Sequence, residues 1–135
     1  MAEFPGKVRL VYKDFPLSFH AGAEPAAMAA RCAAERGQFW TYHDLLFTGP
    51  PAFSRADLLT YAARLDLRED AFAACLDSGR FRDAVRADMQ EGRSHGVTGT
   101  PTFFVNGRRL VGAQPLAAFR EAVADALAEV RGKAR

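Results

Sequence analysis

The stretch from Gly96 to Gly112 constrains the fold more than any other part of the chain. It contains two short apolar runs, Thr102–Val105 and Arg109–Gly112, and the pair Asn106-Gly107 stands between them. Asn-Gly favours the positive φ angles of a two-residue turn, and the flanking runs carry strand-type side chains. The sequence therefore predicts a β-hairpin over this stretch.

The part of the chain before the hairpin has the pattern of a series of helices. Apolar residues recur there at three- and four-residue spacing, and the intervening stretches contain Gly, Pro and Ser, which end helices. Ser54 followed by Asp57 resembles a capping box at the start of one of them. The sequence predicts helices over about 24–36, 39–47, 55–65, 69–76 and 81–93.

One strand and one more helix complete the predicted plan. Residues 8–12, VRLVY, alternate in character and are rich in β-branched and aromatic side chains, which favours a strand. After Pro115, apolar residues such as Leu116 and Phe119 form the stripe of an amphipathic helix that packs on the sheet. The result is an α/β plan with few strands. With 135 residues, of which 49% are hydrophobic, we expect a single domain over residues 1–135.

Several motifs in this order resemble the thioredoxin superfamily, and in detail its DsbA-like branch of bacterial thiol–disulfide oxidoreductases. The resemblance covers nearly the whole chain. Its motifs are Phe15-Pro16-Leu17 with His20, Gly37-Gln38-Phe39-Trp40 with His43-Asp44 and Leu46-Phe47, the stretch Gly96–Gly107, and Gly112-Ala113. It implies an α/β thioredoxin-like fold with a helical insertion at about 54–95, and a cis peptide bond before Pro101.

The redox centre of the resembled family has no counterpart in this sequence. Family members begin with a strand and then place Cys-x-x-C at the N-terminus of a helix, which lowers the pKa of the first cysteine. The only cysteines here are Cys32 and Cys75. The resemblance aligns residues 8–12 with the second strand of the family's sheet. We therefore expect an N-terminally incomplete domain that has no catalytic residue of its own.

The absent first strand would lie between the strands expected at 8–12 and 102–105. Without it, backbone N–H and C=O groups lose their partners, at a cost on the order of 1–3 kcal/mol for each buried group. Either strand 8–12 slides next to 102–105, or two chains share strands in a symmetric dimer. We expect the homodimer, because sliding would disturb the connection through Phe15-Pro16-Leu17 to the first helix.

The loop before the hairpin is the substrate-binding surface that the resemblance implies. A cis-proline has no N–H and turns the neighbouring backbone groups toward an extended substrate, which can pair with them. Thr100 would offer that backbone beside Pro101, and Val97 belongs to the same loop. His95 comes just before the loop and would titrate near a bound substrate. These four residues form the predicted binding site for an extended peptide or protein.

Cys32 and Cys75 allow three interpretations. They form a structural disulfide between two helices, a new redox pair, or two buried free thiols. Cysteines more than forty positions apart cannot use the geometry of adjacent redox cysteines. The resemblance favours the disulfide, because members of the family commonly use extra cysteines structurally, and we expect the two residues to lie close enough to bridge.

Charge and composition favour no other class of partner. The chain has 18 Lys and Arg against 16 Asp and Glu, and the two signs are interspersed, so we expect neither nucleic acid nor a membrane as partner. There is no secretory signal pattern, so the compartment is open, although the resembled family is usually extracytoplasmic. His20, His43 and His95 lie in different segments without close ligands, and we predict no metal and no cofactor.

Two classes of function follow from the resemblance. In the first, the chain is a shortened form of a thiol–disulfide oxidoreductase and is inactive alone. In the second, it is a non-catalytic module that binds peptides with the proline loop or exchanges strands with another chain. An upstream reading frame that encodes a strand and Cys-x-x-C would favour the first class.

Overall fold

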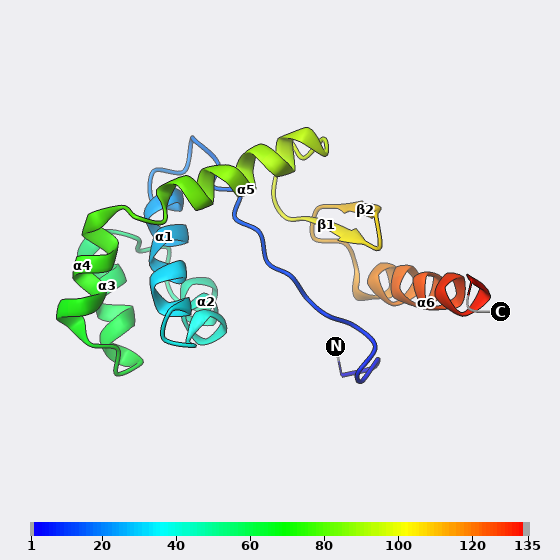
Figure 1. Cartoon of the computed structure of the whole chain (residues 1–135), viewed down its shortest axis with the longest axis horizontal. Helices are drawn as coiled ribbons and strands as arrows, with labels where there is room; N and C mark the ends of the chain where they lie inside the picture. The colour runs from blue at the N-terminus through cyan, green and yellow to red at the C-terminus, as the bar shows by residue number, and fades with distance from the viewer. Residues whose placement is uncertain (1, 134–135) are drawn as a thin grey trace. The chain divides into compact units, whose positions relative to one another are not determined.

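The structure is a computed structural model that describes residues 2–133, and these residues form two compact units (Figure 1). Residues 13–94 make up a helical unit, and residues 2–12 together with 95–133 make up a hairpin unit. The single domain expected over residues 1–135 stays a prediction, because two compact units can belong to one domain.

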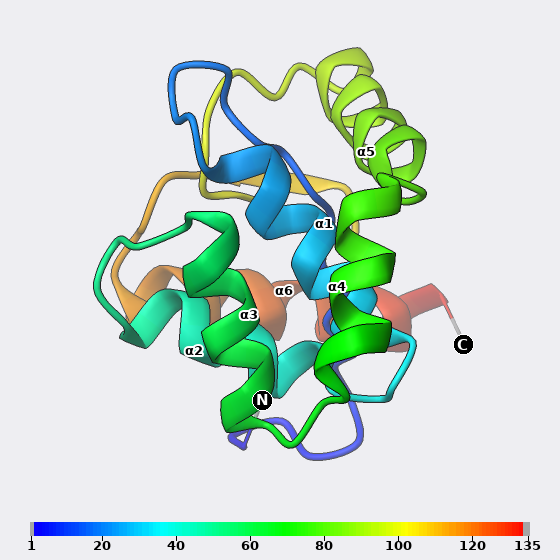
Figure 2. The ribbon, with the colours of Figure 1, turned by 90° about the vertical axis from the view of Figure 1, so that its left-hand side faces the viewer.

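Five helices form the helical unit, and each prediction of a helix there is confirmed to within two residues at either end. The first of them, α1, packs against the other four, and α3 and α4 run side by side (Figure 2). The bounds are α1 Ala23–Ala34, α2 Phe39–Thr48, α3 Arg55–Arg64, α4 Glu69–Ser78 and α5 Arg82–Ser94.

The ends of these helices follow local sequence signals. The Ser54 side chain accepts a hydrogen bond from the N–H of Asp57, and the Asp57 carboxylate accepts one from the N–H of Ser54. This confirms the predicted capping box at the start of α3. Helix α4 ends at Gly79, whose φ of +63° lies in the left-handed region that favours glycine.

The apolar core of the helical unit forms around α1. Ala29 and Ala33 are fully buried, and their small side chains let the neighbouring helices approach closely. Tyr42 of α2 is also fully buried, and its hydroxyl donates a hydrogen bond of 2.9 Å to the carbonyl of Leu58. The Tyr42 ring lies 5.5 Å from that of Phe72 in α4. The polar end of a core tyrosine is thus satisfied, as burial requires.

The hairpin unit contains the predicted β-hairpin and the predicted C-terminal helix. Strands β1 (Thr102–Val105) and β2 (Arg108–Val111) are antiparallel, with Val105 opposite Arg108. Asn106 and Gly107 both have positive φ, as a two-residue turn requires. Helix α6 (Leu116–Lys133) packs against β1. The predictions of the hairpin and of this helix are confirmed.

The predicted strand at residues 8–12 is wrong. None of these residues is in a strand, and the only strand pair within residues 2–133 is β1 with β2. The segment has strand-type side chains, but a strand forms only where its backbone groups find a partner. The alternative in which residues 8–12 slide next to 102–105 is therefore also absent from this chain.

Candidate functional site

The four residues predicted to bind substrate lie in one loop, which connects α5 to β1. His95 follows α5 directly, and the peptide bond between Thr100 and Pro101 is cis and immediately precedes β1. His95, Thr100 and Pro101 are exposed. Val97 is only 9% exposed, so its side chain helps to anchor the loop and is not part of the exposed surface.

Three hydrogen bonds attach this loop to the hairpin. The Arg109 guanidinium donates to the Gly96 carbonyl at 3.0 Å, and the Gly112 N–H donates to the Pro101 carbonyl at 2.8 Å. The hydroxyl of Thr102, the first residue of β1, donates to the Gly99 carbonyl at 2.7 Å. The carbonyls near both ends of the loop therefore have hydrogen-bond donors. These hydrogen bonds fix the loop that carries the exposed residue Thr100.

Gly96 is a glycine for two reasons. Its φ is +77°, and a Cβ atom at this position would lie 2.9 Å from Nη1 of Arg109. Arg109 is the residue of this site that the sequence analysis missed. The signal for it is the Asn-Gly turn, because a two-residue turn places Arg109 opposite Phe104 on the neighbouring strand.

One edge of β1 is open within the described residues. Successive residues of an antiparallel strand direct their backbone groups alternately to the two sides. Val105 closes the turn with Arg108, so the backbone groups of Val105 and Phe103 face β2. Those of Thr102 and Phe104 face the other side, where no strand of residues 2–133 pairs with them. An extended backbone can add to β1 there, directly after the loop.

The open face of the hairpin carries aromatic side chains. The His95 ring lies 6.3 Å from the Phe104 ring in an edge-on arrangement, and both residues are exposed. On the opposite face, Phe103 packs edge-on against Phe119 of α6 at 4.8 Å. His95 of the loop and Phe104 of β1 thus form one exposed surface that has both apolar and polar atoms.

The two cysteines form a disulfide in the helical unit. Cys32 of α1 and Cys75 of α4 are joined by an S–S bond of 1.99 Å, with their Cα atoms 6.0 Å apart. Both residues are buried in the helical core. The prediction that they bridge is confirmed, and the free-thiol interpretation is wrong. A bonded, buried sulfur offers no thiolate for attack on a substrate disulfide.

A buried charge cluster lies in the same unit. Arg31 of α1 donates hydrogen bonds to Asp14 at 2.6 Å and to Asp88 of α5 at 2.7 Å. Asp14 is 5% exposed, and its N–H also donates to Asp88 at 3.0 Å. Burial raises the pKa of Asp14, although the Arg31 guanidinium acts in the opposite direction. The cluster attaches the chain before α1 to two helices, and its residues meet no substrate surface.

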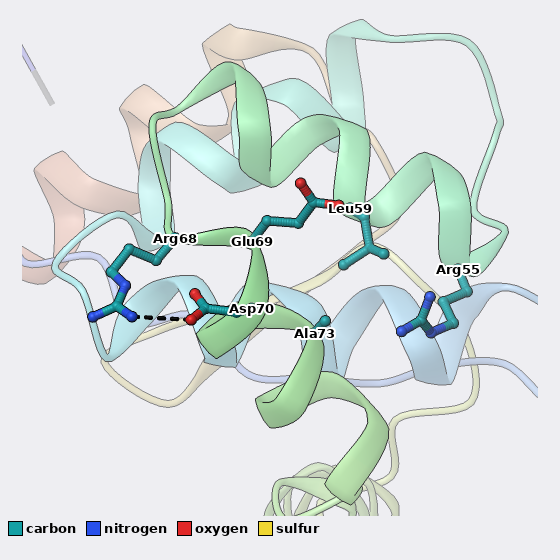
Figure 3. Close-up of a pocket in the computed structure, with 6 residues that line it drawn as sticks. All are labelled: Arg55, Leu59, Arg68, Glu69, Asp70 and Ala73. Carbon is teal, nitrogen blue, oxygen red and sulfur yellow. Dashed lines mark hydrogen bonds and ion pairs between the residues drawn. The ribbon is translucent and has the colours of Figure 1, made fainter.

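Helices α3 and α4 also line a shallow surface hollow (Figure 3). Leu59 and Ala73 contribute apolar surface there. The two arginines at this hollow are already paired, because Arg68 donates to Asp70 at 2.9 Å and Arg55 forms two hydrogen bonds with Asp77. With its cations neutralised, this hollow is a poorer candidate for a binding site than the loop at 95–101.

Two further features bear on the kind of protein. Within residues 2–133, no group of three or more His, Cys, Asp or Glu side chains is arranged to hold a metal ion. None of the described helices combines the length and the apolar character that crossing a membrane requires.

The family of the chain follows from a comparison of its sequence with known proteins. A family model described as Thioredoxin matches residues 2–125, which include the helical unit, the loop before β1, the hairpin and the first half of α6. The chain belongs to the thioredoxin family. Its thioredoxin-like fold is mixed α/β, with a small two-stranded sheet and several helices, as the sequence predicts.

Curated relatives of this thioredoxin-family chain are much longer proteins. One named Na(+)/H(+) antiporter NhaA 3, from Salinispora tropica, is 44% identical over 92% of the chain and 19% of the relative. One named Na(+)/H(+) antiporter NhaA 1, from Salinispora arenicola, is 41% identical over 95% of the chain and 20% of the relative. The chain thus spans about a fifth of their length. No solved structure matches it.

Proposed function

We propose that the chain is the substrate-binding part of a DsbA-like thiol–disulfide oxidoreductase and is inactive in disulfide exchange when alone. One observation carries this proposal. The exposed loop at Thr100 and Pro101 continues directly into a strand with an open edge, whereas Cys32 and Cys75 are bonded to each other and buried. The chain thus offers a surface for a substrate. It offers no thiolate that could attack a disulfide bond of that substrate.

The open edge of β1 supports an extended peptide as the substrate class. Thr102 and Phe104 direct backbone donors and acceptors away from β2. A peptide that pairs with this edge next to Thr100 gains main-chain hydrogen bonds, and His95 and Phe104 contact its side chains. Such recognition depends on the extended backbone of the bound peptide more than on its amino-acid sequence. It therefore suits a protein that acts on unfolded or extended chains.

A second candidate is a non-catalytic module that uses the same loop inside a longer protein or complex. The lengths of the relatives favour it, because the matched segment is about a fifth of each named antiporter. A domain of this type therefore occurs as one part of a longer chain. We assign no antiport activity to residues 1–135. Genomic DNA upstream of the Met1 codon separates the two candidates, since an in-frame Cys-x-x-C would support the oxidoreductase.

Peptide binding tests the proposal. The probe is insulin B chain with its cysteines blocked and a fluorescein label, and fluorescence anisotropy gives the Kd. Thr100→Arg places a large charged side chain on the loop and should weaken binding about tenfold or more. Thr41→Arg, at an exposed position on α2, should leave the Kd within about twofold, since surface substitutions elsewhere have small effects.

The result that would overturn the proposal is equally definite. If the wild-type chain does not bind the probe, or if both variants bind as tightly as the wild type, the loop is not the substrate surface. Circular dichroism and thermal unfolding of both variants must match the wild type. Position 100 is exposed, so the substitution is expected to leave the fold intact.

A further inference from the structure

The hairpin unit contains a small groove that the proposed function does not use. The groove lies between the N-terminal turn at residues 3–7 and helix α6, and both of its sides belong to this one unit. Its lining comes from residues 3–7 and 124–131, and its volume is about 310 Å³. We propose that this α6 groove binds a small carboxylate with an apolar chain, such as a short fatty acid.

The N-terminal turn is attached to α6 beside the groove. Glu3 accepts two hydrogen bonds from the Arg120 guanidinium, at 2.6 and 2.5 Å. Within the turn, the Lys7 N–H donates to the Phe4 carbonyl at 3.1 Å, and Gly6 has a φ of +68°, in the left-handed region that favours glycine. Interactions within the unit therefore hold the two sides of the groove, as in the largely pre-formed sites that bind small molecules.

The floor of the groove is apolar. On α6, the lining residues Ala124, Leu127 and Ala128 are three or four positions apart and share one face of the helix. Phe4 and Pro5 contribute apolar side chains from the turn. Phe4 and Leu127 are half-buried, whereas Ala124 and Ala128 are exposed, and the small alanine side chains leave room beside them. An alkyl chain in this groove would be removed from water, which favours binding.

The charged groups of the groove favour an anion. Its lining contains two cations, Lys7 and Arg131, and one acid, Glu3. The hydrogen bond from Arg120 lowers the pKa of Glu3, so the Glu3 carboxylate stays ionised and pairs with Arg120. Within residues 2–133, the side chains of Lys7 and Arg131 form no hydrogen bond or ion pair. Two positive charges without a counter-charge thus remain beside an apolar floor.

These two properties together define the class of ligand. An inorganic anion such as phosphate would pair with a cation and leave Phe4 and Leu127 uncovered. A neutral apolar molecule would leave Lys7 and Arg131 without a counter-charge. A carboxylate on an alkyl chain satisfies both requirements, because its charged end pairs with a cation while its chain covers the apolar side chains. The groove volume is near the lower end of the range for small-molecule sites, so the chain is short.

The α6 groove is separate from the peptide-binding surface of the proposed function. No lining residue of the groove belongs to the loop at Thr100 and Pro101 or to β1. A carboxylate in the groove therefore leaves the open edge of β1 available to a peptide. The two sites can be tested with different probes.

An NMR titration with octanoate tests the groove. Octanoate is added to the isotope-labelled chain, and the amide shifts of residues 3–7 and 124–131 should change most and give a Kd. Acetate has the carboxylate without the long chain, and octanol has the chain without the charge. Each of these two probes should bind at least about fivefold more weakly than octanoate.

Charge variants then test the two cations. The double variant Lys7→Gln, Arg131→Gln removes both unpaired charges and should raise the Kd for octanoate about tenfold. Lys133→Gln is the matched control, because it removes a positive charge from an exposed residue of α6 that does not line the groove. Its Kd should stay within about twofold of the wild type. All three positions are exposed, so the fold should be unchanged, and thermal unfolding checks this.

Three outcomes would overturn the carboxylate site. They are amide shifts that are largest outside residues 3–7 and 124–131, octanol that binds as tightly as octanoate, and a double variant that binds octanoate as tightly as Lys133→Gln does. None of them bears on the binding of the labelled insulin B chain at Thr100. Failure of the carboxylate site and failure of the proposed function can therefore be told apart.

Discussion

Arg31 holds the buried carboxylate of Asp14, with its Nε atom 2.6 Å from Oδ2 of the aspartate. Asp14 lies just after residues 8–12, and Arg31 lies one residue before the disulfide cysteine Cys32 on α1. The contact therefore joins the start of the helical unit to the helix at its centre. A charge buried at such a junction is tolerated only while its partner is present.

Replacing Arg31 with Gln should destabilise the chain substantially. The variant leaves the Asp14 carboxylate buried without its guanidinium partner, and breaking a buried ion pair in this way costs about 3 kcal/mol. Urea unfolding at neutral pH measures the change in the free energy of unfolding. Arg36→Gln, at an exposed position just beyond α1, should cost less than about 0.5 kcal/mol. Equal losses of unfolding free energy in the two variants would show that the Arg31–Asp14 pair contributes nothing to stability.

The titration of Asp14 predicts a pH dependence with a definite sign. Burial raises the pKa of Asp14, so the folded chain binds this proton at a higher pH than the unfolded chain does. The stability linked to this group is complete below about pH 3.9, the usual pKa of aspartate, and is lost as pH rises through the raised pKa. Asp14→Asn removes the titration. Its stability relative to the wild type should therefore increase as pH rises above about 4.

Urea unfolding of the wild type and Asp14→Asn in parallel, at several pH values from acid to neutral, checks this prediction. The pKa values of Asp70 and Asp77 are lowered by their arginine partners, which gives the opposite trend. Both groups are present in both proteins, so their effects cancel in the difference. A relative stability of the variant that falls with rising pH would contradict the raised pKa of Asp14.

Local patterns were sufficient to predict most of the elements. The helices, the capping box at Ser54 and the turn at Asn106-Gly107 each depend on residues close together in the sequence. The loop at Thr100 and Pro101 also depends on residues that are close together in the sequence, and the motif Gly96–Gly107 identifies it. Features of this kind are predictable because the interactions that form them are nearly all contained in the motif.

The features that sequence reasoning missed depend on distant partners. Arg31 meets Asp14 and Asp88 only after α1 and α5 have packed, and nothing in their spacing predicts the cluster. The prediction of a strand at residues 8–12 is wrong for a related reason. The composition of these residues favours a strand, but a strand needs a second strand beside it, and local composition does not report whether one is available.

The disulfide should contribute strongly to stability. Cys32 and Cys75 are 43 positions apart, and in the chain-entropy treatment a loop of this length stabilises the folded state by about 4 kcal/mol. The Cys32→Ala, Cys75→Ala chain should therefore unfold at much lower urea concentration than the wild type. Thiol titration of the denatured, unreduced wild type should find almost no free thiol. Two free thiols per chain in this titration would show that Cys32 and Cys75 are not bonded to each other.

The chain should show no catalysis of thiol–disulfide exchange. Exchange begins when a thiolate attacks a disulfide, and efficient enzymes expose a thiolate of low pKa. Here both sulfur atoms are bonded to each other within the helical core. Dithiothreitol-driven reduction of insulin should therefore be no faster with the wild type than with Cys32→Ala, Cys75→Ala, assayed where both proteins are folded. The double variant is the right control because it keeps the loop at Thr100 and Pro101 and loses only the sulfurs. A rate clearly above this control would show that the Cys32–Cys75 pair is redox-active, and the chain would then be an enzyme without Cys-x-x-C.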